Sequence, residues 1–307
     1  MSSGGVHPVR PKGMLKGVLL TLLATLCIVL MNACAKMSSA VHSPVEMIFY
    51  RGVVALCLLV PYMLATHPLS IFKTRRIGAH LYRSAVGNIG VGLVFWAYAL
   101  MPMANTTALL FAAPLFVTAL SPLLLKEHVD AGRWIAVIVG FGGILLIARP
   151  SAGLLADPAS VVGLGGALCM ALVDMALRNL GSSENPLTTV FYFILGGVIL
   201  SAPYTLIYGH LPEGRLLPWI LGIGVFTAIQ QLAKTAAFRY CEASFLAPYT
   251  YTSMVWAPLI GWLLWREIIT LPVILGTGVV VASNLFILRR AGGNVCESFP
   301  QVPKSPY

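Results

Sequence analysis

The chain has 307 residues, of which 58% are hydrophobic and only 10% are charged. Soluble domains contain about 25% charged residues, so this chain has too few polar side chains to cover a water-exposed surface. The composition excludes a cytosolic enzyme, a secreted disulfide-linked domain and a disordered regulator. The net charge of +10 comes from cations at the ends of apolar runs, not from one cluster, which argues against nucleic-acid binding.

Ten apolar runs are long enough to cross about 30 Å of hydrocarbon as α-helices. In chain order they cover residues 14–35, 44–64, 80–101, 105–125, 133–148, 160–180, 186–207, 216–238, 243–264 and 269–288. The first run follows Arg10, Lys12 and Lys16 as a signal peptide would, but it is longer than a signal-peptide core and has a counterpart later in the chain. The sequence therefore predicts an all-α integral membrane protein with ten transmembrane helices, flanked by tails at 1–13 and 291–307.

Lysine and arginine are distributed unequally between the two sides of these runs. With the N-terminus in the cytoplasm, fourteen of the twenty fall on the cytoplasmic side and five on the other side, while Lys234 lies inside a run. Positive charges concentrate on the cytoplasmic side of membrane proteins. We therefore expect a multi-pass protein of the cell inner (plasma) membrane with both termini in the cytoplasm.

The two halves of the chain repeat one another. A shift of 142 residues places Asn32, Lys36, Pro44, Phe49 and Tyr50 on Asp174, Arg178, Pro186, Phe191 and Tyr192. A shift of 140 residues places Ala97, Lys126, Glu127 and Arg149 on Ala237, Arg266, Glu267 and Arg289. Each repeat, at 14–149 and 150–290, holds five spans, and because five is odd the second must enter the membrane from the opposite side. Such inverted repeats are typical of secondary transporters, whose binding sites lie near the bilayer midplane.

Two long segments carry a family resemblance. The segments FAAPLFVTALSPLLLKEHVD with GRWIAVIVGFGGILLIARP, and APYTYTSMVWAPLIGWLLWREIITLPVILGTGVVVAS, resemble the two halves of an EamA-type transporter of the drug/metabolite transporter superfamily. Residues 247–252 with Trp256, Gly261 and Trp262 resemble the branch associated with S-adenosylmethionine uptake and with export of amino-acid-derived metallophores. The resemblance implies a substrate cavity lined mainly by the third, fourth, eighth and ninth spans.

From this resemblance we expect a carrier that exports a small, amino-acid-derived compound bearing a carboxylate, such as an opine-type metallophore. Uptake of S-adenosylmethionine or an amino acid is the alternative, and a membrane-embedded enzyme or assembly subunit is the alternative of another class. The sequence holds no HExxH and no P-loop motif, so we predict no catalytic residue, cofactor or metal ligand. The expected partners are a small-molecule metabolite and the lipid bilayer, without nucleic acid, and the sequence leaves a homodimer open.

The eighth span carries one polar face, because Thr227, Gln230 and Lys234 are spaced three and four residues apart. A cation at the centre of a span costs about 2.5 to 3.5 kcal/mol, so we predict that this face lines a cavity in which Lys234 attracts an anionic group. Snorkelling of Lys234 to the headgroups is the alternative. The other predicted substrate-binding residues are aromatic or amide side chains of the ninth and third spans, namely Trp256, Tyr249, Tyr251, Asn88 and Trp96. For the aromatic ones, interfacial anchoring is the alternative.

Three more charged residues within spans are candidates for coupling or gating. Asp174 and Glu46 are the carboxylates best placed to carry a proton, since the other acids lie at helix ends or in loops. Arg51 shares the second span with Glu46. The alternative for Asp174 is an intramembrane ion pair with Arg178, one turn away.

Overall fold

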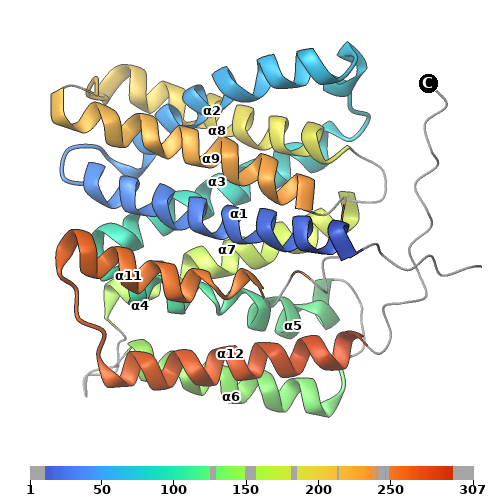
Figure 1. Ribbon diagram of the computed structural model, residues 1–307, viewed down its shortest axis with the longest axis vertical. Helices are drawn as coiled ribbons and strands as arrows, with labels where there is room; N and C mark the ends of the chain where they lie inside the picture. Colours follow the sequence, from blue (N-terminus) through green and yellow to red (C-terminus); the bar gives the residue numbers. More distant parts are fainter. Residues whose placement is uncertain are drawn as a thin grey trace, which may run out of the picture.

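The structure is a computed structural model that describes residues 11–124, 129–148, 157–180, 185–212, 214–237 and 249–292, together with residues 240 and 246. Most of both predicted tails, and most of the start of the predicted ninth span, lie outside these residues. All regular structure in the described part of the chain is helical (Figure 1).

The helices follow the predicted spans in order. In the first half they are α1 (Pro11–Ser38), α2 (Pro44–Thr66), η1 (Leu69–Phe72), α3 (Ile77–Leu100), α4 (Met103–Leu110), α5 (Ala113–Leu124) and α6 (Ala131–Ala148). In the second half they are α7 (Pro158–Leu180), α8 (Pro186–Tyr208), η2 (Gly214–Leu216), α9 (Leu217–Ala237), α11 (Ser253–Trp265) and α12 (Leu271–Gly292).

Within the described residues, seven helical segments are long and apolar enough to cross a membrane, with α4 and α5 counted as one and η2 counted with α9. The helices α11 and α12 supply two shorter apolar segments. The 24-residue α3 supplies the tenth. The predicted fold class, ten transmembrane helices in two inverted repeats, is confirmed.

The two repeats begin their second helices in the same way. In α2, Pro44 occupies the first turn and Ser43 caps it, accepting a hydrogen bond from the backbone N–H of Glu46. In α8, Pro186 occupies the first turn and Asn185 accepts from the N–H of Leu187. Proline suits the first turn because its missing N–H would have no helical partner there. The prolines that the 142-residue shift aligned therefore start equivalent helices.

The helices pack in pairs that the repeat symmetry relates. Helix α1 packs along α9 as α7 packs along α3, and α2 packs against α8 as α6 packs against α12. Figure 1 shows these pairs in layers, from α2 and α8 at one end of the molecule to α6 and α12 at the other. The layers follow one pseudo-two-fold axis that crosses the helices, as inverted repeats require.

The helix ends that meet confirm that the repeats are inverted. The start of α2 meets the chain after α8, where the His210 N–H donates to Glu46. At the opposite end, the start of α3 meets the start of α8, where Ser84 donates to the carbonyl of Tyr192. Following the predicted orientation, we call the face with the end of α1 and the start of α2 the outer face, and the opposite one the inner face.

Candidate functional site

Helices α2 and α8 cross where equivalent residues of the two repeats meet. The 142-residue shift carries Arg51 to Phe193 and Gly52 to Ile194. The Arg51 guanidinium lies 5.6 Å from the centre of the Phe193 ring. A Cβ atom added to Gly52 would lie 3.5 Å from the carbonyl oxygen of Ile194 and would clash with the Val198 side chain of α8, so glycine permits the close approach of the two helices. A residue can touch its own repeat equivalent only near the axis that relates them, so this crossing marks the axis.

A second meeting of equivalent residues occurs where two spans are interrupted. Helix α4 ends and α5 begins on either side of a turn at Phe111, and a turn at Tyr251 precedes α11. The 140-residue shift relates these residues, and their rings stack with centres 4.9 Å apart and planes 21° apart. Substrate sites of carriers built from inverted repeats lie at the repeat interface, where helices are discontinuous. The two interruptions therefore lie where such a site is expected.

The carbonyl group exposed by each interruption is satisfied differently. The Met254 N–H donates to the carbonyl of Tyr251 over 3.0 Å. At the equivalent position the first repeat has Pro114, which has no N–H. Instead, the Asn284 side chain of α12 donates to the carbonyl of Phe111 over 3.0 Å. The interruption in the first repeat is therefore bonded to a helix of the second repeat.

Two arginines are buried around Phe193. Arg51 is 4% exposed and Arg83 of α3 is 6% exposed, and the Arg83 guanidinium lies 4.8 Å from the same ring. Arg83 donates to the Thr189 carbonyl over 2.7 Å. The carboxylate of Asp174 interacts electrostatically with the Arg83 guanidinium. Arg51 forms no ion pair with any residue that the structure describes, and its Nε has no hydrogen-bond partner there. A cation–π contact contributes about 0.5 to 2 kcal/mol, which is less than the roughly 2.5 to 3.5 kcal/mol cost of an intramembrane arginine.

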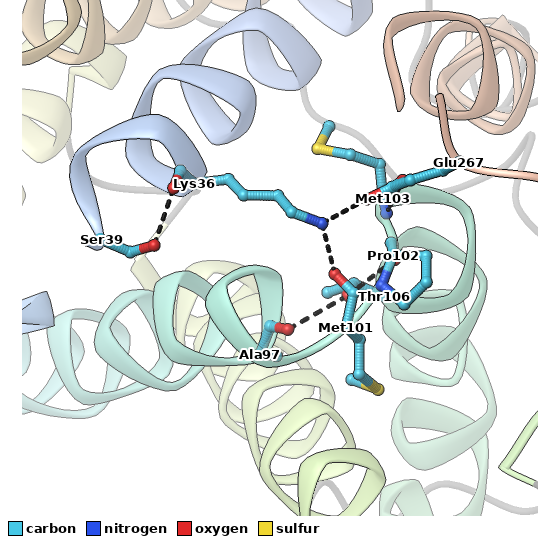
Figure 2. Close-up of polar contacts among 8 residues, drawn as sticks. All are labelled: Lys36, Ser39, Ala97, Met101, Pro102, Met103, Thr106 and Glu267. Atoms are coloured by element: carbon cyan, nitrogen blue, oxygen red, sulfur yellow. Dashed lines mark hydrogen bonds and ion pairs between the residues drawn. The ribbon is translucent and has the colours of Figure 1, made fainter. Parts of the chain in front are cut away.

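A polar network joins the repeats at the outer face (Figure 2). Lys36, at the end of α1, donates to the Met101 carbonyl over 2.8 Å and to Glu267 over 2.5 Å. The second carboxylate oxygen of Glu267 accepts from the Met103 N–H over 2.7 Å. The ammonium group of Lys36 also lies 5.0 Å from the centre of the Trp265 ring. This outer network fixes the ends of α1, α3 and α11 to one another.

The backbone after α11 places Glu267 in the outer network. Arg266 has a positive φ of 57°, a left-handed conformation that reverses the chain after Trp265. The Glu267 N–H then donates to the Gly261 carbonyl over 3.3 Å. A Cβ atom at Gly261 would lie 2.5 Å from the Glu267 carboxylate, so a larger residue there would displace it. The sequence motif around Gly261 therefore positions a contact between the repeats.

The polar face predicted on the eighth span separates into two environments along α9. Thr227 is 2% exposed and donates to the Ile223 carbonyl and to the Met31 sulfur, so it lies in the interface with α1. Gln230 is half-buried and Lys234 is exposed. That Gln230 and Lys234 line a cavity remains a prediction.

The aromatic and amide candidates also lie in different places. Asn88 is buried and donates to the carbonyls of Ser84 and Phe193, which attaches α3 to α8. Trp96 is 48% exposed, whereas Trp256 is half-buried and its indole N–H has no hydrogen-bond partner among the described residues. Tyr249 is half-buried one turn before α11. Of these candidates, Tyr251 lies at the axis and Trp256 presents an unused donor.

The coupling candidates differ in depth. Glu46 lies in the first turn of α2 at the outer face, where it accepts from the N–H groups of Ser43 and His210. Asp174 lies in α7, more than one turn from its inner end, and is exposed. The side chain of Arg178, its predicted partner, lies outside the described part of the structure.

An apolar crevice of about 170 Å³ opens between α4, α11 and α12. Its lining residues are Ala104, Ala108, Met254, Pro258, Ile269, Val273, Ile274 and Thr277. None of the predicted substrate-binding residues lines this crevice.

Sequence reasoning missed several residues of these contacts. Arg83 is one of the fourteen cations that the sequence assigns to the cytoplasmic side, but the structure places it in the second turn of α3 and buries it. Phe111 and Phe193 were not singled out, although the repeat shifts carry Phe111 to Tyr251 and Phe193 to Arg51. Reading the shifts as contacts across the axis would have found both.

The EamA-like transporter family matches this chain twice, at residues 15–149 and 158–289. The chain belongs to the EamA-like transporter family. It is therefore a multi-pass membrane protein of the drug/metabolite transporter superfamily that transports small molecules, and it is not an enzyme.

Several relatives are similar to the chain over most of their length. A riboflavin transporter of Vibrio cholerae is 31% identical over 286 residues, 90% of this chain and 93% of the relative. A pseudopaline exporter of Pseudomonas aeruginosa is 29% identical over 280 residues, 90% of this chain and 97% of the relative. An S-adenosylmethionine uptake transporter of Rickettsia felis is 24% identical over 245 residues, 79% and 82% of the two chains. A solved crystal structure with 16% identity has a TM-score of 0.61 and covers 92% of this chain and 99% of its own, which supports the fold.

Proposed function

We propose that this protein exports a small, polar, amino-acid-derived metabolite that carries a carboxylate across the cell inner membrane. The stacking of Phe111 on Tyr251 supports this proposal most directly, because it joins two interrupted helices at the axis between the repeats. The pseudopaline exporter supports the direction and the class of cargo. Uptake of S-adenosylmethionine or transport of riboflavin is the second candidate, favoured by the other two relatives.

The transport cycle alternates between openings at the two faces. The outer network closes the outer face by holding α1, α3 and α11 together. Opening that face requires Lys36 to leave Glu267 while the repeats rock about the axis. Near the axis, Trp256 offers an N–H donor to the substrate and Tyr251 offers an aromatic surface. Gln230 and Lys234 attract the anionic group at the inner end of α9.

Vesicle transport tests the function directly. Inside-out and right-side-out membrane vesicles that contain the protein are incubated with a cell-metabolite extract, with S-adenosylmethionine and with riboflavin, and their contents are measured by mass spectrometry. Export predicts that carboxylate-bearing amino-acid derivatives accumulate in the inside-out vesicles. Accumulation of S-adenosylmethionine or riboflavin in right-side-out vesicles would favour the second candidate, and absence of any flux would contradict transport.

We also propose that both termini are cytoplasmic, on the basis of the charge distribution. Reporter fusions after Lys73 and after Arg289 should report the cytoplasm, and a fusion near Gly209 should report the outside. A periplasmic signal after Arg289 would contradict this orientation.

A further inference from the structure

Arg51 lies close to the middle of the membrane-spanning bundle. It is four residues from the centre of the 23-residue α2, about 6 Å along the helix axis. Its guanidinium contacts Phe193, its own repeat equivalent, so the charged group lies near the pseudo-two-fold axis. In transporters built from inverted repeats, substrate sites lie at this level between the repeats.

The neighbouring charged groups are matched by protein partners. Arg83 is held by the Thr189 carbonyl and is influenced by Asp174. At the outer face, Lys36 is paired with Glu267, and Glu46 accepts hydrogen bonds from backbone N–H groups.

Arg51 differs from these groups. The buried Nε of Arg51, like that of Arg83, donates to no described acceptor, but Arg51 also lacks the carbonyl and the carboxylate that Arg83 has, and within the described part of the chain only a ring lies beside it. An ionisable residue inside the membrane marks a substrate or ion pathway more often than a structural position. Because Arg51 is 4% exposed, a ligand reaches it only when α2 and α8 move apart.

We propose that Arg51 binds a carboxylate of the transported molecule at the crossing of α2 and α8. The carboxylate accepts two parallel hydrogen bonds from the guanidinium, including one from Nε, while the Phe193 ring supports the guanidinium. Arg83, on the same ring, adds a second positive charge.

This inference rests on the proposed transport function and narrows its substrate class. Amino-acid derivatives and S-adenosylmethionine carry a carboxylate, whereas riboflavin has no ionised group at neutral pH. The Arg51 site therefore favours the first two classes over riboflavin.

Ligand binding to the purified full-length protein tests the site without requiring flux. The probes are L-methionine and L-histidine, each compared with its carboxamide, and the measurement is the ligand-dependent shift of the thermal unfolding midpoint. The wild-type protein should bind each carboxylate about 10- to 100-fold more tightly than its carboxamide, as for a charge-assisted hydrogen bond. Arg51→Met should lose this preference, and Arg51→Lys should keep part of it.

A matched control is Arg215→Met, because Arg215 is an exposed arginine in η2, outside the site. It should keep the full preference for carboxylates. If Arg51→Met does not purify as folded protein, Arg51→Gln replaces it, since glutamine keeps hydrogen-bond donors without the charge. The proposal is overturned if the wild-type protein binds neither carboxylate, if it binds carboxylates and carboxamides equally, or if the preference persists without the Arg51 charge. Vesicle flux combined with no binding preference for carboxylates would overturn this site and leave the transport function standing. A binding preference for carboxylates without vesicle flux would overturn the transport function and leave the site standing.

Discussion

Lys36 and Arg51, two cations of the first repeat, lie within the bundle under opposite conditions. Lys36 is at the outer end of α1, where a carbonyl, a carboxylate and an aromatic ring surround its ammonium group. Arg51 is near the middle of α2, where Phe193 supports it and no described carboxylate approaches it. A cation with protein partners holds helices together. A cation without them is available to a ligand. Lys36 is of the first kind and Arg51 is of the second.

The largest expected effect comes from Asp174→Asn, which removes the carboxylate that interacts with Arg83 and leaves Arg83 with only the Thr189 carbonyl and the Phe193 ring as partners named above. If Asp174 carries the coupled proton, pH-gradient-driven flux in vesicles should be abolished while substrate exchange continues. Glu46→Gln is the matched comparison, because its carboxylate lies in the first turn of α2. Gradient dependence that survives in both variants would show that neither carboxylate carries the coupled proton.

Glu267→Gln tests the comparison between the two cations at Lys36, because it leaves Lys36 without its carboxylate. The side chains of Lys36 and Glu267 are only 13% and 16% exposed, so the loss should destabilise the protein by about 1 to 3 kcal/mol, less than for a fully buried pair. Thermal unfolding of purified protein measures the change.

A double-mutant cycle shows whether the two groups act together. Lys36→Met combined with Glu267→Gln should be less destabilised than the sum of the single changes. Asp130→Asn is a control, because its pair with Arg133 is 41% and 20% exposed and should contribute at most about 1 kcal/mol. Strictly additive effects of Lys36 and Glu267 would show that the network does not couple the repeats.

Lys234→Met should have the smallest effect, since Lys234 is exposed in α9 and its charge is more easily screened than that of a buried group. If Lys234 attracts the substrate, flux should fall at unchanged membrane abundance, and Lys234→Arg should keep part of it. Transport assays with immunoblotting of the membrane fraction separate the two readouts. Normal flux in the methionine variant would show that Lys234 snorkels to the headgroups.

Most of the fold could be predicted because its signals are local. The length of the apolar runs predicts the helices, and an odd number of spans in each repeat predicts the inversion. The interruptions at Phe111 and Tyr251 were not predicted, because both lie inside continuous apolar runs.

The candidate site was less predictable, because its contacts join residues far apart in the chain. Nothing near Glu267 in the sequence indicates that it pairs with Lys36, 231 residues away. Hydropathy locates Lys234 and Arg51 within spans, but it does not show which of the two side chains points toward other helices. Only packing distinguishes exposed Lys234 from buried Arg51.

The hydrogen bond from Asn284 to the Phe111 carbonyl makes one half of the chain depend on the other. The 140-residue shift carries Pro114 to Met254 and Asn284 back to Ile144, so each half has one member of a complementary pair. Here the proline of one half depends on the asparagine of the other, because without Asn284 the Phe111 carbonyl would have neither a backbone donor nor a side-chain donor. The two halves are therefore not interchangeable at this contact.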